Sequence, residues 1–148
     1  MSLPDLDPLR QLLLEESTLA LATVDPDGAP AIAPLFYLAD AELLRLYWLS
    51  SPSSRHSRNL GVQSEAAVTV FHPTSDWRSI RGAQMTGPVE IVRGARRKEL
   101  LALYAERFAL RASFRLAIRR SSLYEFRPRR VRYLDNSVRF GYKTDFEL

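Results

Sequence analysis

The sequence predicts a mainly β fold, an antiparallel barrel with a few flanking helices (α+β), in one domain that spans residues 1–148. Short runs rich in apolar and β-branched residues alternate with turn residues, and few segments have helical spacing. The first strands also follow one another too closely for the helical crossovers of a parallel sheet. A chain of 148 residues with 46% hydrophobic residues can bury a core without disulfides or metals.

The first fifty residues are predicted to form a helix and a meander of three strands. Asp7 and Pro8 are typical of a helix start, and the leucines after them keep helical spacing up to Glu16. The three strands are expected at Thr18 to Val24, Ala31 to Leu38 and Leu43 to Leu49. The sequence DPDG at 25–28 is a turn signal, and the prolines at 30 and 34 place the second strand at a sheet edge or a bulge.

The remainder is predicted to alternate helices with four more strand segments. A short helix is expected at Arg55 to Leu60, and a second helix after Gly94 with its apolar side chains on one face. The strands are expected at Ala66 to Phe71, at Ile80 to Val92 as one long strand or two interrupted at Gly87-Pro88, at Ser122 to Phe126 and at Val131 to Leu134. No element is predicted in the tail after residue 135.

Composition excludes several classes of function. The chain has no cysteine, so thiol catalysis, iron–sulfur clusters and disulfides are excluded. Its two histidines, His56 and His72, have no metal-ligand spacing, so we expect no metal site. Neither a Gly-x-Ser-x-Gly elbow nor a glycine-rich phosphate loop occurs. No apolar run is long enough to span a membrane and the N-terminus is acidic, so we expect a cytoplasmic protein without membrane contact.

The charge is unevenly distributed along the chain. Residues 93–132 contain 13 basic and three acidic residues, and 19 of the 21 basic residues of the whole chain are arginine. Such a stretch can attract nucleic acid or an anionic cofactor, because arginine suits phosphate recognition. It can equally be the solvated face of a helix.

The segment from Leu46 to Leu60 combines groups that bind anions. An aromatic strand leads into the serine-rich turn 50–54, which feeds a short helix carrying Arg55, His56 and Arg58. Hydroxyls, free backbone N–H groups and the positive helix end would gather there. The segment is therefore interpreted either as a phosphate site or as a polar helix-capping turn with solvated arginines.

This segment resembles the flavin-binding split barrels related to pyridoxamine 5′-phosphate oxidase. The family pattern is an aromatic strand ending in Ser or Thr, then Ser-Arg-Lys, then a polar residue and Leu. Here it corresponds to Tyr47-Trp48-Leu49-Ser50, Ser54-Arg55-His56 and Asn59-Leu60. The stretches VQSEAAVTVF, WRSIRGAQMTG and ESTLALATVDPDGAPAIAPLFYL are similar to the family's neighbouring strands.

The resemblance implies a six-stranded antiparallel split β-barrel that binds FMN non-covalently at the interface of a homodimer. Carried over to this chain, Ser50 and Ser54 would offer hydroxyls to the phosphate and Arg55 would pair with it. His56 stands where the family usually has Lys. The remaining implied polar contacts to phosphate, ribityl chain or ring are Ser51, Asn59 and Gln84. The implied function is an FMN-dependent oxidoreductase that transfers hydride to or from a small organic substrate.

The chain departs from the oxidase itself. The basic residues of the oxidase's second strand are replaced here by Ala33 and Leu38, and its C-terminal Trp and Arg pattern is absent. We therefore do not expect pyridoxamine phosphate oxidation. A deazaflavin, haem or no cofactor are the alternatives to FMN. A binding or sensing module without turnover, or a nucleic-acid binder that uses residues 93–132, are the alternative functions.

Overall fold

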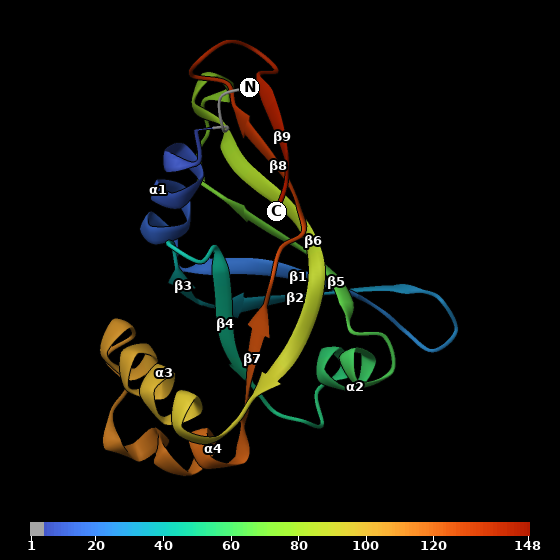
Figure 1. Ribbon diagram of the computed structural model, residues 1–148, viewed down its shortest axis with the longest axis vertical. Coiled ribbons are helices and arrows are strands. Elements are labelled where there is room, and N and C mark those ends of the chain that lie inside the picture. The colour runs from blue at the N-terminus through green and yellow to red at the C-terminus, as the bar shows by residue number, and fades with distance from the viewer. Residues whose placement is uncertain (1–4) are drawn as a thin grey trace.

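A curled antiparallel sheet with helices at its periphery forms the body of the protein (Figure 1). The computed structural model describes residues 5–148, so the first four residues of the acidic N-terminal segment lie outside the described part. The strands are β1 (Thr18–Val24), β2 (Pro30–Phe36), β3 (Leu38–Asp40), β4 (Arg45–Ser50), β5 (Glu65–Phe71), β6 (Arg81–Val92), β7 (Ser122–Phe126), β8 (Arg130–Asp135) and β9 (Lys143–Glu147). The helices are α1 (Asp7–Glu15), α2 (Arg55–Val62), α3 (Gly94–Arg107) and α4 (Arg115–Arg120), with 3-10 turns at Trp77–Ser79 and Ala112–Phe114.

The predicted fold class, a mainly β antiparallel split barrel with flanking helices, is confirmed. The sheet contains nine strands within residues 5–148 rather than the six of the expectation. β3 is a three-residue piece that follows β2 after the buried Tyr37. β9 forms in the tail, where a single buried residue, Phe146, lies among charged ones. β3 is too short, and β9 is too polar, to give a strand pattern in the sequence.

β6 joins the two halves of the curled sheet. The main order is β2-β1-β5-β6-β7-β4-β3, and β8 and β9 continue the sheet from β6 on a branch. The first part of β6 pairs with β5 and β8, and its last four residues pair with β7. β6 is therefore one continuous strand, and the interruption considered at Gly87-Pro88 is absent. β2 lies at a sheet edge, as its prolines predict.

Gly87 marks the place where the chain leaves β7 for β8. Arg127 donates its N–H to the carbonyl of Pro88 at 3.1 Å, and Arg129 donates to the carbonyl of Thr86 at 2.8 Å. A Cβ atom on residue 87 would lie 2.0 Å from the carbonyl oxygen of Arg127. Only glycine allows this close approach of two backbones.

The core lies between the curled sheet and α1, with a second small cluster under α3. The three buried leucines of α1 pack with side chains such as Tyr37, Trp48 and Phe126. The second cluster joins Tyr47, Val92, Leu100 and Leu123. The buried polar and charged side chains of the described residues are Thr23, Ser57, Asn59 and Glu125. Three of these four are near α2, which packs against β1 and β2.

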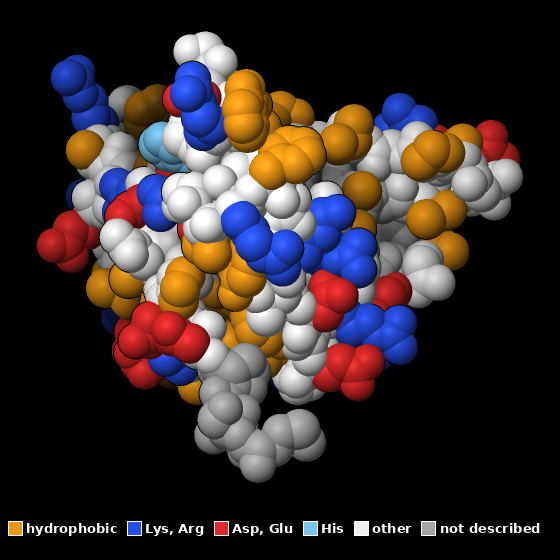
Figure 2. All heavy atoms as spheres, turned by 90° about the horizontal axis from the view of Figure 1, so that it is seen from above, with side chains coloured by type: hydrophobic (Ala, Val, Ile, Leu, Met, Phe, Trp, Pro, Cys, Tyr) orange, Lys and Arg blue, Asp and Glu red, His pale blue; other side chains and the backbone are white. Residues whose placement is uncertain are grey.

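The β8–β9 loop lies at one end of the molecule (Figure 1). Large hydrophobic side chains of this loop and of the 3-10 turn Trp77–Ser79 are exposed. Figure 2 views this end and shows hydrophobic side chains among charged ones. Trp77 and Phe140 are 55% and 77% exposed, and their rings meet edge to face at 5.5 Å. Within residues 5–148, no helix has the length and apolar character needed to cross a bilayer.

Candidate functional site

The serine turn between β4 and α2 is ordered by its own hydroxyls. Ser50 ends β4, and Ser54 is the N-cap of α2, where its Oγ accepts the N–H of Ser57 at 3.3 Å. The N–H of Ser54 donates to the carbonyl of Ser51 at 3.1 Å, which closes the turn. A serine N-cap satisfies one of the free N–H groups at the helix start, so the chain enters α2 at a fixed angle.

Four side chains form a hydroxyl–imidazole cluster at this turn: Ser50, Ser54, His56 and Ser57. Nε2 of His56 lies 2.5 Å from Oγ of Ser50 and 3.1 Å from Oγ of Ser54. Ser54 in turn donates to Oγ of Ser57 at 2.8 Å. Burial lowers the pKa of His56, so its imidazole is neutral at pH 7. Rotatable hydroxyls, one imidazole and a helix N-terminus are donors that fit the oxygens of a phosphate.

Arg55 and Asn59 are turned toward Asp25 in the β1–β2 hairpin. Arg55 donates from Nε at 2.8 Å and also from Nη2 to the Asp25 carboxylate. Nδ2 of Asn59 donates to Oδ1 of Asp25 at 2.9 Å and to Oγ1 of Thr23 at 3.0 Å. Hydrogen bonds from Arg55 and Asn59, together with the Arg55 charge, lower the pKa of Asp25 to about 2. These contacts fasten α2 to the hairpin, so Arg55 has a carboxylate partner where a phosphate was expected.

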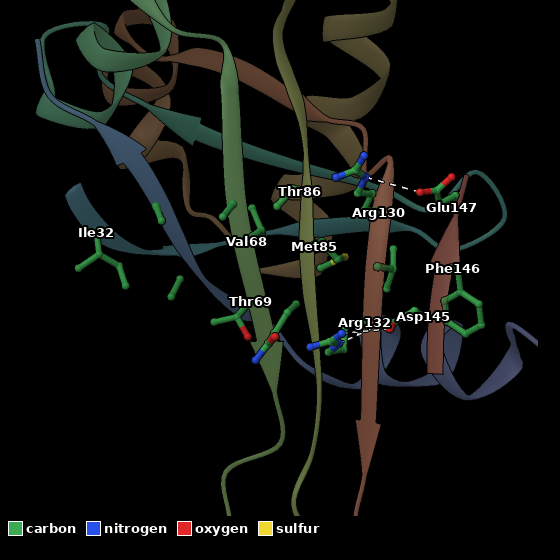
Figure 3. A pocket seen from close by; sticks show the side chains of 15 residues that line it. Ile32, Val68, Thr69, Met85, Thr86, Arg130, Arg132, Asp145, Phe146 and Glu147 are labelled. Carbon is green, nitrogen blue, oxygen red and sulfur yellow. Dashed lines mark hydrogen bonds and ion pairs between the residues drawn. The ribbon is translucent and has the colours of Figure 1, made fainter. Parts of the chain in front are cut away.

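Gln84 lies on another part of the molecule, the open face of the sheet. It lines a hollow of about 870 Å³ over β1, β5, β6 and β8, together with small and apolar side chains such as Ala20, Ala22 and Ile32. Figure 3 shows two ion pairs at the rim, Arg132 with Asp145 at 2.8 Å and Arg130 with Glu147 at 3.7 Å. The other expected site residues do not line this hollow. The structure therefore divides the expected site into the serine turn and the open face.

Three residues of the turn and its surroundings were not predicted as site residues. Asp25 was assigned only to a turn, Thr23 only to a strand, and Ser57 was not singled out. The spacing of Ser57 three residues after Ser54 was an available signal, because positions i and i+3 share a helix face. Asp25 contacts Arg55 from 30 residues away in the chain, and no local pattern reveals such a pair.

The two histidines have different partners, and His72 lies away from the serine turn. Nδ1 of His72 lies 2.8 Å from Oε1 of Glu16, on the side of the sheet near α1. No group of three His, Cys, Asp or Glu side chains within the described residues is arranged to hold a metal ion.

Known proteins resemble this chain in sequence. Residues 6–135 match the family model described as pyridoxamine 5′-phosphate oxidase. A UPF0306 protein of Cronobacter sakazakii is 32% identical over 111 residues, which cover 75% of this chain and 74% of that protein. The relatives compared thus carry a UPF0306 name and not that of the oxidase.

Solved structures share the fold. A haem-binding protein from Mycobacterium smegmatis has a TM-score of 0.77 and 22% identity, over 99% of this chain and 60% of that one. An FMN-binding, pyridoxamine 5′-phosphate oxidase-related protein from Nostoc punctiforme has a TM-score of 0.70 and 15% identity, over 99% and 98% of the two chains. With the family match over residues 6–135 and the split-barrel topology, the chain belongs to the pyridoxamine 5′-phosphate oxidase family.

Proposed function

We propose that the protein is an FMN-dependent oxidoreductase that acts on a small organic substrate as a homodimer. The observation that carries this proposal is the hydroxyl–imidazole cluster of Ser50, Ser54, His56 and Ser57 at the start of α2. A helix N-terminus with rotatable donors is a favourable place for a phosphate group. The FMN-binding description of a structural neighbour agrees with the proposal.

The cluster fits the phosphate of FMN by its chemistry. Four contacts of 2.5–3.3 Å link the three hydroxyls and Nε2 of His56, so a bound phosphate oxygen can replace some of these hydrogen bonds. Arg58 is exposed one turn after Arg55 and adds positive potential on the same helix. Arg55 fastens the start of the helix to Asp25. The part of its positive charge that Asp25 does not neutralise adds to the positive potential at the turn.

The open face of the sheet supports the homodimer. Ile32, Phe36 and Phe71 are 75%, 58% and 58% exposed. Apolar area of this kind on one sheet face, next to the edge strand β2, is what a second copy of the chain would cover. Gln84 lies on this face, so its amide suits the ribityl chain or the ring of a flavin rather than the phosphate.

FMN and the protein would have different roles in the reaction. Bound FMN would supply the hydride chemistry. The chain's own residues would bind the phosphate, orient the ring and exclude water at the interface. Because burial lowers the pKa of His56, its neutral imidazole would contact the phosphate by hydrogen bonding and without adding charge near pH 7.

The test compares FMN with riboflavin, which lacks the phosphate. We expect the purified protein to be yellow, or to quench the fluorescence of added FMN with a Kd at least tenfold below that for riboflavin. Ser50→Ala should remove most of this difference, whereas Ser53→Ala, an exposed residue of the same turn, should keep it. Equal affinity for the two flavins would refute the phosphate site. A haem Soret band in the purified protein would instead identify haem as the bound cofactor.

Turnover is tested separately on the FMN-loaded protein. Anaerobic bleaching of the flavin band by a nicotinamide donor, followed by reoxidation with an added quinone, is expected for an oxidoreductase. A flavin band that no donor reduces would favour a binding or sensing module.

A further inference from the structure

Glu125 is a buried carboxylate on the side of the sheet that faces α3. It lies in β7 between Tyr47 of β4 and Glu90 of β6, and it is 2% exposed. Nε of Arg127 donates to its Oε1 at 2.5 Å, and guanidinium groups of Arg45 and Arg96 lie 3.4 and 3.5 Å from its Oε2. One buried carboxylate therefore holds three arginines in place.

The cluster carries more positive than negative charge. Burial alone would raise the pKa of Glu125, but hydrogen bonds from Arg127 and Tyr47 and the nearby arginine charges outweigh it and lower the pKa. The carboxylate is therefore ionised. Glu90 balances Arg127 in part, at 3.2 Å, but its side chain is 61% exposed. The arginines that surround Glu125 are thus not neutralised by it alone.

A cavity of about 190 Å³ opens beside this cluster. Its residues belong to the end of β6, the start of α3 and β7, whose backbones lie close together in Figure 1. Three arginines (Arg93, Arg96 and Arg127) line it together with two carboxylates (Glu90 and Glu125), and Ile91 and Val92 complete its wall. Arg96 uses one nitrogen, Nη2, toward Tyr47 and Glu125, which leaves its Nη1 and Nε for another acceptor. The guanidinium groups of Arg96 and Arg127 are therefore oriented by the protein before any ligand arrives.

The charges around the start of α3 are otherwise hard to account for. The first turn of the helix has no acidic residue, and Arg93 at its N-cap provides no side-chain cap. Cations are unfavourable at this end of a helix. Arg97 has a structural role, since it donates to the carbonyls of Ile118 and Ser121 at 3.2 and 2.8 Å. Arg96 contacts Tyr47 and Glu125 through Nη2, whereas no hydrogen bond or ion pair of the Arg93 side chain is found within the described residues, and an anion in the cavity would offset the excess charge.

We propose that the cavity lined by Arg93, Arg96 and Arg127 binds the phosphoryl group of a small molecule. The lining holds three guanidinium groups and two carboxylates, and Arg45, which pairs with Glu125, adds a fourth guanidinium, so the surplus of two positive charges matches a dianion. Planar guanidinium groups pair with phosphate oxygens in bidentate fashion. A cavity of about 190 Å³ holds one phosphoryl group and a few further atoms, but not a nucleic-acid strand. The proposal is independent of the flavin site, because Glu125 and α3 contribute nothing to the serine turn.

The experiment follows backbone amides by NMR while inorganic phosphate is added to the ¹⁵N-labelled full chain. Sodium chloride at equal ionic strength is the reference titration. We expect the amides of residues 94–97 to shift along a saturable curve with phosphate and not with chloride. Shifts of residues 51–57 report the serine turn separately, so failure of one site is distinguishable from failure of the other.

Two matched variants decide whether the cavity is responsible. Arg93→Gln should weaken the phosphate affinity read at residues 94–97 about tenfold, because it removes a charge-assisted contact. Arg115→Gln removes an equally exposed arginine of α4 outside the cavity and should leave the affinity within about twofold. Equal effects of the two variants, or shifts that follow ionic strength alone, would overturn the proposal. Unchanged thermal unfolding of both variants confirms that they fold.

Discussion

Replacing Asn59 by alanine tests whether α2 is fastened to the β1–β2 hairpin as the structure shows. Asn59 is 3% exposed, and its Nδ2 donates to Thr23 at 3.0 Å and to Asp25 at 2.9 Å. A hydrogen bond to a neutral hydroxyl contributes about 0.5–1.5 kcal/mol and one to a charged group about 1.5–3 kcal/mol. Asp25 keeps its bonds from Arg55, so the lower half of the sum applies. We expect Asn59→Ala to lower the free energy of unfolding by about 2–3 kcal/mol.

Urea unfolding followed by far-UV circular dichroism measures this loss. Each variant is compared at one protein concentration, because dimerisation would make stability depend on concentration. Arg58→Ala is the matched control, since Arg58 is an exposed neighbour on the same helix and should change stability by less than about 0.5 kcal/mol. FMN affinity should also fall in Asn59→Ala, because α2, which follows the serine turn, would be fastened less firmly to the β1–β2 hairpin.

A result contrary to this reasoning is easy to recognise. If Asn59→Ala and Arg58→Ala lose the same small amount, the two bonds from Nδ2 contribute nothing net to folding. The contacts to Asp25 and Thr23 would then be incidental to the position of α2. If instead Asn59→Ala is destabilised as expected but binds FMN normally, the serine turn is fixed by its own hydroxyls.

Three further outcomes are expected. Gly87→Ala should destabilise by about 3 kcal/mol or more in urea unfolding, because its Cβ would meet backbone 2.0 Å away. Gly61→Ala, in α2 with nothing within 4 Å, should be neutral or stabilising, and equal losses would refute the close approach at residue 87. The pKa of Asp25 is about 2 in the folded state and 3.8 otherwise, so its contribution to stability is complete above about pH 5 and is lost as the pH falls toward 2. The stability gap between the native protein and Asp25→Asn should therefore close over that range; a constant gap would contradict it. Burial lowers the pKa of His56, so the imidazole gains a proton only below the usual range of histidine; FMN binding relative to His56→Gln should strengthen as the pH falls through that lower range, and a flat ratio would remove His56 from the phosphate site.

Local sequence patterns predicted most strands because alternation and turn chemistry act over a few residues. β1 follows its expected bounds, Thr18–Val24, and β7 follows Ser122–Phe126. β9 could not be predicted in this way, since Lys143–Glu147 buries only Phe146. Its pairing with β8 is supported by the ion pair between Arg132 and Asp145, which lie 13 residues apart. Such partners become visible only when the two strands are already adjacent.

The local parts of the candidate site could be predicted from the sequence, whereas its long-range contacts could not. The serine turn and the start of α2 at Arg55 are local features, and the sequence analysis located both. The partner of Arg55 was not located, because Asp25 belongs to a hairpin 30 residues earlier. A guanidinium in a sequence shows that an anion is needed, but not whether the protein or a ligand supplies it.

Buried polar side chains occur both near the serine turn and in the cluster around Glu125. A buried polar group is costly unless it is hydrogen-bonded, so each one must have a partner brought by another element. In β7 the sequence LYEF places an acid between aromatic residues, and residues 123–126 are all buried. Neither face of this strand meets water, because the core covers one face and the α3 cluster covers the other. Glu125 therefore requires cations, which Arg45 and two arginines of the basic stretch, Arg96 and Arg127, supply in excess of what one carboxylate can neutralise. The basic stretch is thus explained in part by a buried acid inside the fold, and the remaining charge is what a bound anion would complement.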